Sequence, residues 1–541
     1  MTRLASAFIK CMARSKKGCG KYSLASVSGV AGLGALLLTR EGKNDDDNIV
    51  LGTKGLLRFV RSVRIGLTIT LDYYVSMQGL TDGKPNYDVM MSRIHRRCAE
   101  RIRDGCLQNG GTYVKLGQGL VSLSHILPKE YIDSLKILQD KCLKREKDEL
   151  YQIFEEDFGQ KPEELFQSFD IEPIAAASIA QVFKATTRDG QEVAIKVQYK
   201  DLRRRLNGDI LTLKILLKTG TWFHPKVDLS WIVDEFRETL SQELDFINEG
   251  LNGERCARDL HHLKYVYIPT VLWNYTSPRI LVTEFIDAIK INNLQALKQN
   301  GFSLADINNK MFEAFGYQIF KAGFVHADPH PGNVMVRRQN GKTELIILDH
   351  GLYQEVLDTE RIALSHMWKA IVLGDHRNMR KYSNILGVED YEKFAEILTQ
   401  APLKSRGFKL KKKLSEEDLA YMQQQTAEHF DEITRCLQQM PKTLILVVRN
   451  LNTLRAISFD HGSPVDRYAI LARMASKAAF DDESKGNGKI KQITVKLWFE
   501  LALIINKFVT FWRIVLVDIF YKLGLIPNIK PLIDMEINRQ L

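Results

Sequence analysis

Three things are scarce in this chain of 541 residues: paired cysteines, acidic residues near its start and uninterrupted apolar runs. The seven cysteines are scattered without a CxxC pair, which argues against a disulfide framework and a zinc site and fits a reducing compartment. Residues 1–40 contain seven Lys or Arg and no Asp or Glu, and without those seven charges the net charge of +11 falls to +4. No basic groove interleaved with aromatic residues accompanies this charge, so we expect no nucleic-acid partner.

The two ends of the chain bear on its location. The acid-free N-terminus with its basic and serine residues predicts a mitochondrial presequence, with a disordered basic tail as the alternative. The uncharged segment 22–39 is short beside the roughly 20 residues of a spanning helix, and it is either a marginal single-pass anchor or an extension of the presequence. Residues 495–527 are apolar but interrupted by charges, which favours helices packed on the protein body over helices on a membrane surface.

The spacing of apolar residues predicts an α+β chain. Residues 51–170 have helical periodicity, and short β-rich runs follow, including a hairpin over 181–198 and a strand over 279–284. We further expect helices over 229–251 and 304–321, a buried strand over 344–348 and helices beyond 360. The predicted parts are a presequence and anchor (1–50), a helical extension (51–170), an N-lobe (171–289), a C-lobe (290–480) and an apolar helical tail (481–541).

One motif set carries most of the functional information. Asp328 and Asn333 lie in His-Ala-Asp-Pro-His-Pro-Gly-Asn, and Asp349 opens Asp-His-Gly sixteen residues after Asn333. Phosphoryl transfer of the protein-kinase type needs one carboxylate beside the attacking hydroxyl, and an Asn and an Asp to hold magnesium on the phosphates. Lys196 ends Val-Ala-Ile-Lys on a predicted strand, where a kinase lysine contacts the α- and β-phosphates. The sequence therefore predicts a two-lobed, protein-kinase-like fold that binds ATP or ADP with Mg²⁺.

A different interpretation of the same loop is a metal centre. His326, Asp328, His330 and Asn333 have a plausible ligand spacing. That interpretation leaves Lys196 and Asp349 without a role, so we prefer phosphoryl transfer. His350 stands where most kinases have Phe, which we interpret as a structural change.

Three acids follow Lys196 by about fifty residues and compete to be its partner. Asp245 and Glu249 are four residues apart and share a helical face, and Glu243 lies on a neighbouring one. Acids this close repel one another unless cations lie nearby, so we expect a second cation besides Lys196. Upstream of the lysine, alanines occupy the positions where a phosphate-covering loop has glycines, which predicts a stiffer loop.

Together these motifs resemble the UbiB family, also called aarF-domain-containing atypical kinases, over roughly residues 90–460. The resemblance rests on the KxGQ motif (Lys115 to Gln118), the alanine-rich loop, the ExD motif (Glu243, Asp245), HxDxHPxN and Asp349-x-Gly351. The family motif KxGQxxS is altered here, because position 121 is Val and the serine is Ser122.

The resemblance implies that the KxGQ helix folds over the cleft, that Lys115 contacts Glu243, and that Glu249 pairs with Lys196. The implied catalytic residues are Asp328, Lys196 and Glu249, with Asn333 and Asp349 as metal ligands and Lys115, Gln118, Glu243 and Asp245 as regulatory residues. The implied nucleotide-binding residues are Ala175, Ala176, Ala177, Ser178, Ala180, Val182, Ala194, Lys196, Glu284 and Ile286.

Three functions follow as alternatives. The first is a mitochondrial, membrane-associated atypical kinase or ATPase, with nucleotide and mitochondrial membrane lipids as partners and a protein complex left open. The resemblance implies the ATPase activity and a role in lipid or quinone metabolism. The second is a Ser/Thr protein kinase. The third is a nucleotide-gated membrane scaffold without required turnover.

Overall fold

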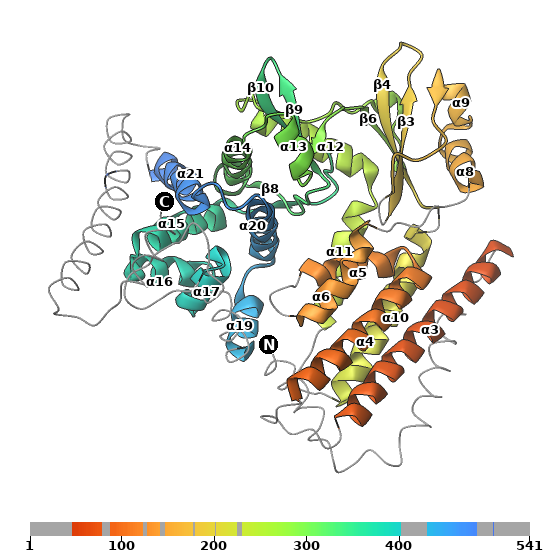
Figure 1. Ribbon diagram of the computed structural model, residues 1–541, viewed down its shortest axis with the longest axis horizontal. Helices are drawn as coiled ribbons and strands as arrows, with labels where there is room; N and C mark the ends of the chain where they lie inside the picture. Colours follow the sequence, from red (N-terminus) through yellow and green to blue (C-terminus); the bar gives the residue numbers. More distant parts are fainter. Residues whose placement is uncertain are drawn as a thin grey trace. The chain divides into compact units, whose positions relative to one another are not determined.

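The computed structural model describes residues 46–77, 87–122, 127–140, 147–176, 179–200, 202–223, 230–401, 430–483 and 501. These residues form two compact units (Figure 1). The first unit contains the described residues up to Leu251 together with Thr270–Phe285. The second contains Asn252–Pro269 and the described residues from Ile286 onward. Residues 252–269 thus group with the second unit, although they fall within the range predicted for the N-lobe.

The first unit combines a helical part with a β-sheet. Its helices are α3 (Asp46–Ser76), α4 (Tyr87–Asn109), α5 (Thr112–Ser122), α6 (Lys129–Leu135), α7 (Ile137–Asp140), α8 (Lys147–Phe158), α9 (Pro162–Leu165), α10 (Leu202–Phe223) and α11 (Ser230–Glu243). Helices α4 and α5 pack on α6, and α10 packs on α3, α5 and α11. This arrangement buries an apolar cluster that includes Tyr113, Val121, Leu135 and Leu138.

The sheet of the first unit has the strand order β1-β3-β4-β6, with β2 also paired to β3. Its strands are β1 (Ser168–Phe169), β2 (Ala175–Ala176), β3 (Ala180–Thr186), β4 (Glu192–Gln198) and β6 (Ile280–Glu284). The hairpin predicted over 181–198 and the strand predicted over 279–284 are confirmed. Side chains alternate between the two faces of a strand, and one face buries Phe183, Val193 and Ile195 against α8 residues such as Phe154.

The second unit is mainly helical around two small sheets. One sheet has the order β5-β10-β9-β7 and the other pairs β11 with β8. The strands are β5 (Val266–Tyr267), β7 (Ile289–Lys290), β8 (Phe324–His326), β9 (Val334–Gln339), β10 (Lys342–Ile347) and β11 (Tyr353–Glu355). The helices are α13 (Leu294–Gln299), α14 (Leu304–Tyr317), α15 (Asp358–Leu373), α16 (His376–Ile385), α17 (Tyr391–Thr399), α19 (Phe430–Gln439), α20 (Lys442–Asp460) and α21 (Arg467–Glu483).

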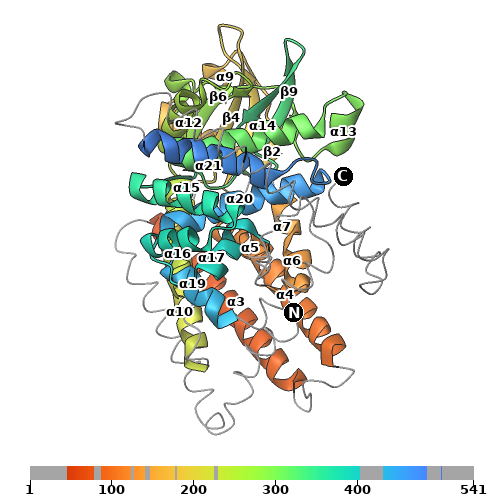
Figure 2. The same ribbon diagram turned by 90° about the vertical axis from the view of Figure 1, so that its left-hand side faces the viewer.

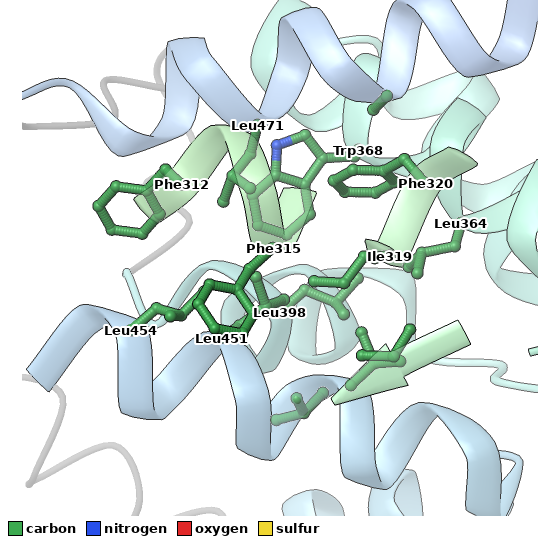
Figure 3. Packing of buried hydrophobic residues seen from close by; sticks show 14 of the residues in the cluster. Phe312, Phe315, Ile319, Phe320, Leu364, Trp368, Leu398, Leu451, Leu454 and Leu471 are labelled. Carbon is green, nitrogen blue, oxygen red and sulfur yellow. The ribbon is translucent and has the colours of Figure 1, made fainter. Parts of the chain in front are cut away.

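Helix α14 is the centre of the largest apolar core. Its residues Phe312 and Phe315 are almost fully buried, and a π-helical turn (Gln318–Ala322) continues it with Ile319 and Phe320 (Figure 3). Helix α21 packs on both α14 and α15 (Figure 2). Within the same core, the ring of Trp368 in α15 lies edge-on to the ring of Phe320. The predicted helix over 304–321 and the predicted strand over 344–348 are therefore confirmed, and the strand begins two residues earlier. This core supports the loops that follow β8 and β10.

One predicted helix needs correction, and the predicted segments at the two ends of the chain lie largely outside the described residues. The helix predicted over 229–251 is two helices, α11 and α12 (Phe246–Leu260), separated at Leu244 and Asp245. Residues 1–45 of the predicted presequence and anchor, which include segment 22–39, and most of the predicted tail 481–541 lie outside the described residues, whereas residues 46–50 belong to α3. Within the described ranges, no helix combines the length and the apolar character needed to cross a membrane.

Candidate active site

The strand lysine of the first unit is held by a buried carboxylate. Lys196 lies on the central strand β4, and its Nζ is 2.7 Å from Oε1 of Glu249 in the first turn of α12. The side chains of Lys196 and Glu249 are 15% and 2% exposed, so little solvent screens this ion pair. The Lys196 ammonium also lies over the Phe246 ring, 5.1 Å from its centre. The contact that the family resemblance implied is present.

The separation of α11 from α12 gives the three acids different roles. Glu243 ends α11, and Asp245 precedes α12, where its Oδ1 accepts a hydrogen bond from the backbone N–H of Asn248 at 3.3 Å. Asp245 therefore acts as an N-cap, which satisfies an otherwise unpaired donor of the helix. The expectation that Asp245 and Glu249 share a face of one continuous helix is wrong, because Asp245 lies outside the helix that contains Glu249.

The second cation is Lys115 of α5. Its Nζ is 2.7 Å from Oε2 of Glu243, and both side chains are largely buried. Gln118 donates a hydrogen bond from Nε2 to the carbonyl oxygen of Leu138 at 2.8 Å, so it fastens α5 to α7. A Cβ at Gly117 would overlap Leu138 Cδ1, so glycine permits this close approach. Within the KxGQ motif, Lys115 thus pairs with the buried Glu243, and Gln118 holds α5 against α7.

The predicted nucleotide-binding residues of β3 and β4 share one face of the sheet. Val182 lies opposite Lys196 in the register, and Ala194 lies two residues before Lys196 on the same face. Ala180 lies on this face too, and it packs in the apolar cluster of the helical extension. Ala175 and Ala176 form β2 and pair with Val182 and Gln181, whereas Ala177 and Ser178 lie outside the described residues. Glu284 ends β6 in the first unit, and Ile286 belongs to the second.

The loop after β8 is folded by its own polar groups. The Asp328 N–H donates to Nδ1 of His326 at 3.1 Å, and the Gly332 N–H donates to Nδ1 of His330 at 3.0 Å. Asn333 donates from Nδ2 to the carbonyl oxygen of Asp328 at 3.4 Å, which closes the loop on itself. His326 is completely buried, and burial lowers its pKa below the usual value of 6.5. Both histidine Nδ1 atoms accept backbone hydrogen bonds, which disfavours the alternative metal centre.

The two predicted metal ligands lie at the same end of a β-hairpin. Val334 of β9 pairs with Ile347 of β10, and the Leu348 N–H donates to the carbonyl oxygen of Asn333 at 2.9 Å. Asp349 is the next residue, and its Oδ1 accepts a hydrogen bond from the Gly351 N–H at 3.0 Å. The hairpin register therefore brings together two residues that are sixteen positions apart in the sequence.

These residues suit magnesium by the chemistry of their donor atoms. An Asp carboxylate and an Asn amide oxygen are hard oxygen ligands, and Mg²⁺ is commonly held by one or two carboxylates together with substrate phosphates. Within the described part of the chain, no cluster of three or more His, Cys, Asp and Glu side chains is placed to hold a metal by itself. Asn333 and Asp349 would hold the ion, and it would neutralise phosphate charge.

Two residues of α20 that no sequence motif indicates hold the catalytic loop. Arg449 donates from Nη2 to Oδ2 of Asp328 at 2.9 Å, with both side chains 25% exposed. The neighbouring Asn450 is fully buried and donates to the carbonyl oxygen of His326 at 2.5 Å. Both lie more than 120 residues after the loop, in a helix with no recognisable motif. The one signal in the sequence is Asn450, a polar residue within a largely apolar stretch of the predicted helix.

Comparison with known proteins agrees with these features. The family model of the ABC1 atypical kinase-like domain matches residues 137–383. The chain is 32% identical over 474 residues to AarF domain-containing protein kinase 1 of Gallus gallus, covering 86% of this chain and 90% of the relative. It is 33% identical to the Mus musculus protein of the same name, covering 80% and 84%. It is 38% identical to "Probable serine/threonine-protein kinase abkD" of Dictyostelium discoideum, covering 81% of this chain and 63% of that longer one.

The fold and the motif geometry define a protein-kinase-like phosphotransferase with a helical extension. The chain belongs to the ABC1/AarF family of atypical kinases. The family resemblance expected from the sequence is therefore confirmed.

Proposed function

We propose that this protein binds Mg-nucleotide and couples phosphoryl transfer or ATP hydrolysis to mitochondrial membrane lipid or quinone metabolism. The observation that carries the nucleotide part is the buried ion pair between Lys196 and Glu249, because a kinase lysine needs an acidic partner to fix its direction. Asn333 and Asp349 support the magnesium part through the hairpin register that joins them. The acid-free N-terminus supports the mitochondrial location. Within the family, the motifs look most like aarF-domain-containing kinase 5, and this finer assignment stays a prediction.

A Ser/Thr protein kinase is the second candidate. The printed names of the relatives favour it, since they are called protein kinases. The two candidates predict different products, because a protein kinase leaves phosphate on a protein and an ATPase releases it.

The test is thermal unfolding of the full chain with and without Mg-ATP, for the wild type and Asp349→Asn. Ligand at 100 times its dissociation constant should add about 2.7 kcal/mol to the stability of the wild type. Asp460→Asn, an exposed acid at the end of α20, serves as the control and should retain the shift. A wild type without any magnesium-dependent shift would overturn the nucleotide proposal.

Phosphate release and protein phosphorylation, followed with and without anionic lipid vesicles, separate the candidates. Free phosphate that rises with vesicles supports the membrane-coupled ATPase. Phosphate that appears only on protein side chains supports the protein kinase. A thermal shift without either product would support a nucleotide-gated scaffold.

A further inference from the structure

His350 of the Asp-His-Gly motif is buried and held on both edges of its ring. It is 5% exposed, its Nε2 lies 3.1 Å from the carbonyl oxygen of Ile347, and its Nδ1 lies 2.9 Å from the hydroxyl of Tyr353. A phenylalanine at this position, as in most kinases, would fill the space without either hydrogen bond. The structural interpretation of His350 made from the sequence therefore leaves its polar contacts unexplained.

These contacts fix which nitrogen carries the proton. A carbonyl oxygen only accepts hydrogen bonds, so Nε2 of His350 must be the donor. In the neutral ring Nδ1 is then the acceptor, and the Tyr353 hydroxyl donates to it. Burial raises the pKa of Tyr353 well above its usual value of 10, so the hydroxyl keeps the proton that it donates. The ring orientation of His350 is thus set by two hydrogen bonds on opposite edges.

A second layer of polar side chains lies behind Tyr353. Its hydroxyl interacts with the Cys256 thiol, whose pKa burial raises to about 12, so this thiol is neutral. Gln318 donates from Nε2 to the Cys256 sulfur at 3.4 Å and accepts the backbone N–H of His326 with its Oε1 at 3.1 Å. One buried network therefore joins the Asp349 loop, the catalytic loop and α12.

Helix α12 holds the other side of His350. Asn252 donates from Nδ2 to the His350 carbonyl oxygen at 3.1 Å. One residue further on, a Cβ built on Gly253 would lie 3.3 Å from Cδ2 of the His350 ring. This spacing is at the tight limit of ordinary packing, so the absence of a side chain at Gly253 lets the helix approach the ring directly.

We propose that His350, clamped by Tyr353 and by Asn252 and Gly253 of α12, is a positioning residue for the magnesium-binding carboxylate of Asp349. The clamp fixes the backbone on the C-terminal side of Asp349, and the Gly351 N–H fixes the carboxylate itself. Mutation of residues that orient a metal ligand without contacting the metal commonly changes the affinity for the metal. This inference rests on the proposed magnesium role of Asp349, and the experiment separates the two.

Two variants of the full chain test the clamp by different routes. Tyr353→Phe removes the hydroxyl whose hydrogen bond Nδ1 of His350 accepts, and it keeps the aromatic ring. Gly253→Ala keeps every hydrogen-bonding group but pushes a methyl group against His350, while alanine favours the helix more than glycine does. The matched control is Gly55→Ala in α3, where an added Cβ has no neighbour within 4 Å.

The readout is binding of fluorescent ADP, titrated with Mg²⁺ and repeated in EDTA, together with thermal unfolding without ligand. Both variants should raise the half-saturating Mg²⁺ concentration by about tenfold, the lower end of the range for residues that support metal ligands. Their ADP affinity in EDTA should equal that of the wild type and of Gly55→Ala. Gly253→Ala should bind Mg²⁺ more weakly without unfolding at a lower temperature.

Each other outcome has a distinct meaning. An unchanged Mg²⁺ requirement in both variants overturns the positioning role and leaves the proposed function intact. Equal losses of ADP affinity with and without Mg²⁺, accompanied by a lower unfolding temperature, would make the clamp purely structural and also overturn it. If the ADP affinity of the wild type does not depend on Mg²⁺, the proposed magnesium site itself is overturned.

Discussion

In the first unit the candidate site residues are held by opposite charges, whereas in the second unit they are held mainly by neutral groups. Lys196 and Lys115 each pair with a buried carboxylate on a helix. The catalytic and metal loops instead depend on backbone N–H groups, amides and histidines. Removing one member of a buried ion pair leaves an uncompensated charge, while a lost neutral hydrogen bond costs much less. The two regions should therefore respond very differently to mutation.

The largest effect is expected at the most buried ion pair. Lys196→Met leaves the carboxylate of Glu249, 2% exposed, without this ammonium, and should destabilise the protein by about 3 kcal/mol. Lys196→Met combined with Glu249→Gln should recover much of that loss, because the buried charge is then absent. Urea unfolding measures both. On the neighbouring strand, Lys184→Met removes a more exposed ion pair, in which Lys184 and Glu192 are 30% and 56% exposed, and should cost less than about 1 kcal/mol. Equal losses of unfolding free energy for Lys196→Met and Lys184→Met would show that burial does not make the Lys196 ion pair more important for stability.

The pair between Lys115 and Glu243 should show the same behaviour more weakly, since Lys115 is 18% exposed. Lys115→Met should destabilise the protein by about 2 kcal/mol. A double-mutant cycle with Glu243→Gln should give a coupling energy of about 1 kcal/mol, within the range for directly contacting residues. Additive losses in the cycle would mean that the two side chains act independently and that the ion pair does not fasten α5 to α11.

Arg449 is the charged exception among the mainly neutral groups that hold the candidate site residues of the second unit. Its partner Asp328 is 25% exposed, so Arg449→Met should cost only about 1 kcal/mol of stability. Turnover should fall by at least about tenfold, because the carboxylate loses the group that orients it. Arg449→Lys keeps the positive charge but lacks the planar, forked guanidinium, so it should restore turnover only in part. Arg435→Met on the exposed face of α19 is the control and should change neither quantity.

The sequence was informative where short-range chemistry sets the structure. The β3–β4 hairpin, the strand before Asp349 and the helix before the catalytic loop follow from periodicity and turn residues. The pairing of Lys196 with Glu249, and of Lys115 with Glu243, came from the family resemblance, because residue spacing alone left three acids as candidate partners of Lys196. The separation of α11 from α12 was missed, because Leu244 and Asp245 interrupt the helix without a Gly or Pro. Arg449 and Asn450 reach the site only through tertiary packing, so no local pattern announces them.

Neutral buried histidines should make the second unit sensitive to mild acid. His461 donates from Nε2 to the carbonyl oxygen of Ile291 at 2.8 Å and accepts from the Asn308 amide at 2.8 Å, and burial lowers its pKa below the usual 6.5. A group with a depressed pKa in the folded state contributes stability that is present above its unfolded pKa and is lost as the pH falls toward its folded pKa. The free energy of unfolding should therefore fall as the pH is lowered from 7.5 to 5.5, and His461 should contribute to that fall.

The buried His326 of the second unit should add to this loss, and so should His95 of the first unit, since burial lowers the pKa of both. His461→Gln, which cannot titrate, should flatten the dependence of unfolding free energy on pH between 7.5 and 5.5. An unchanged slope in that variant would show that His461 does not stay neutral in the folded protein, and that the second unit does not owe its acid sensitivity to this histidine.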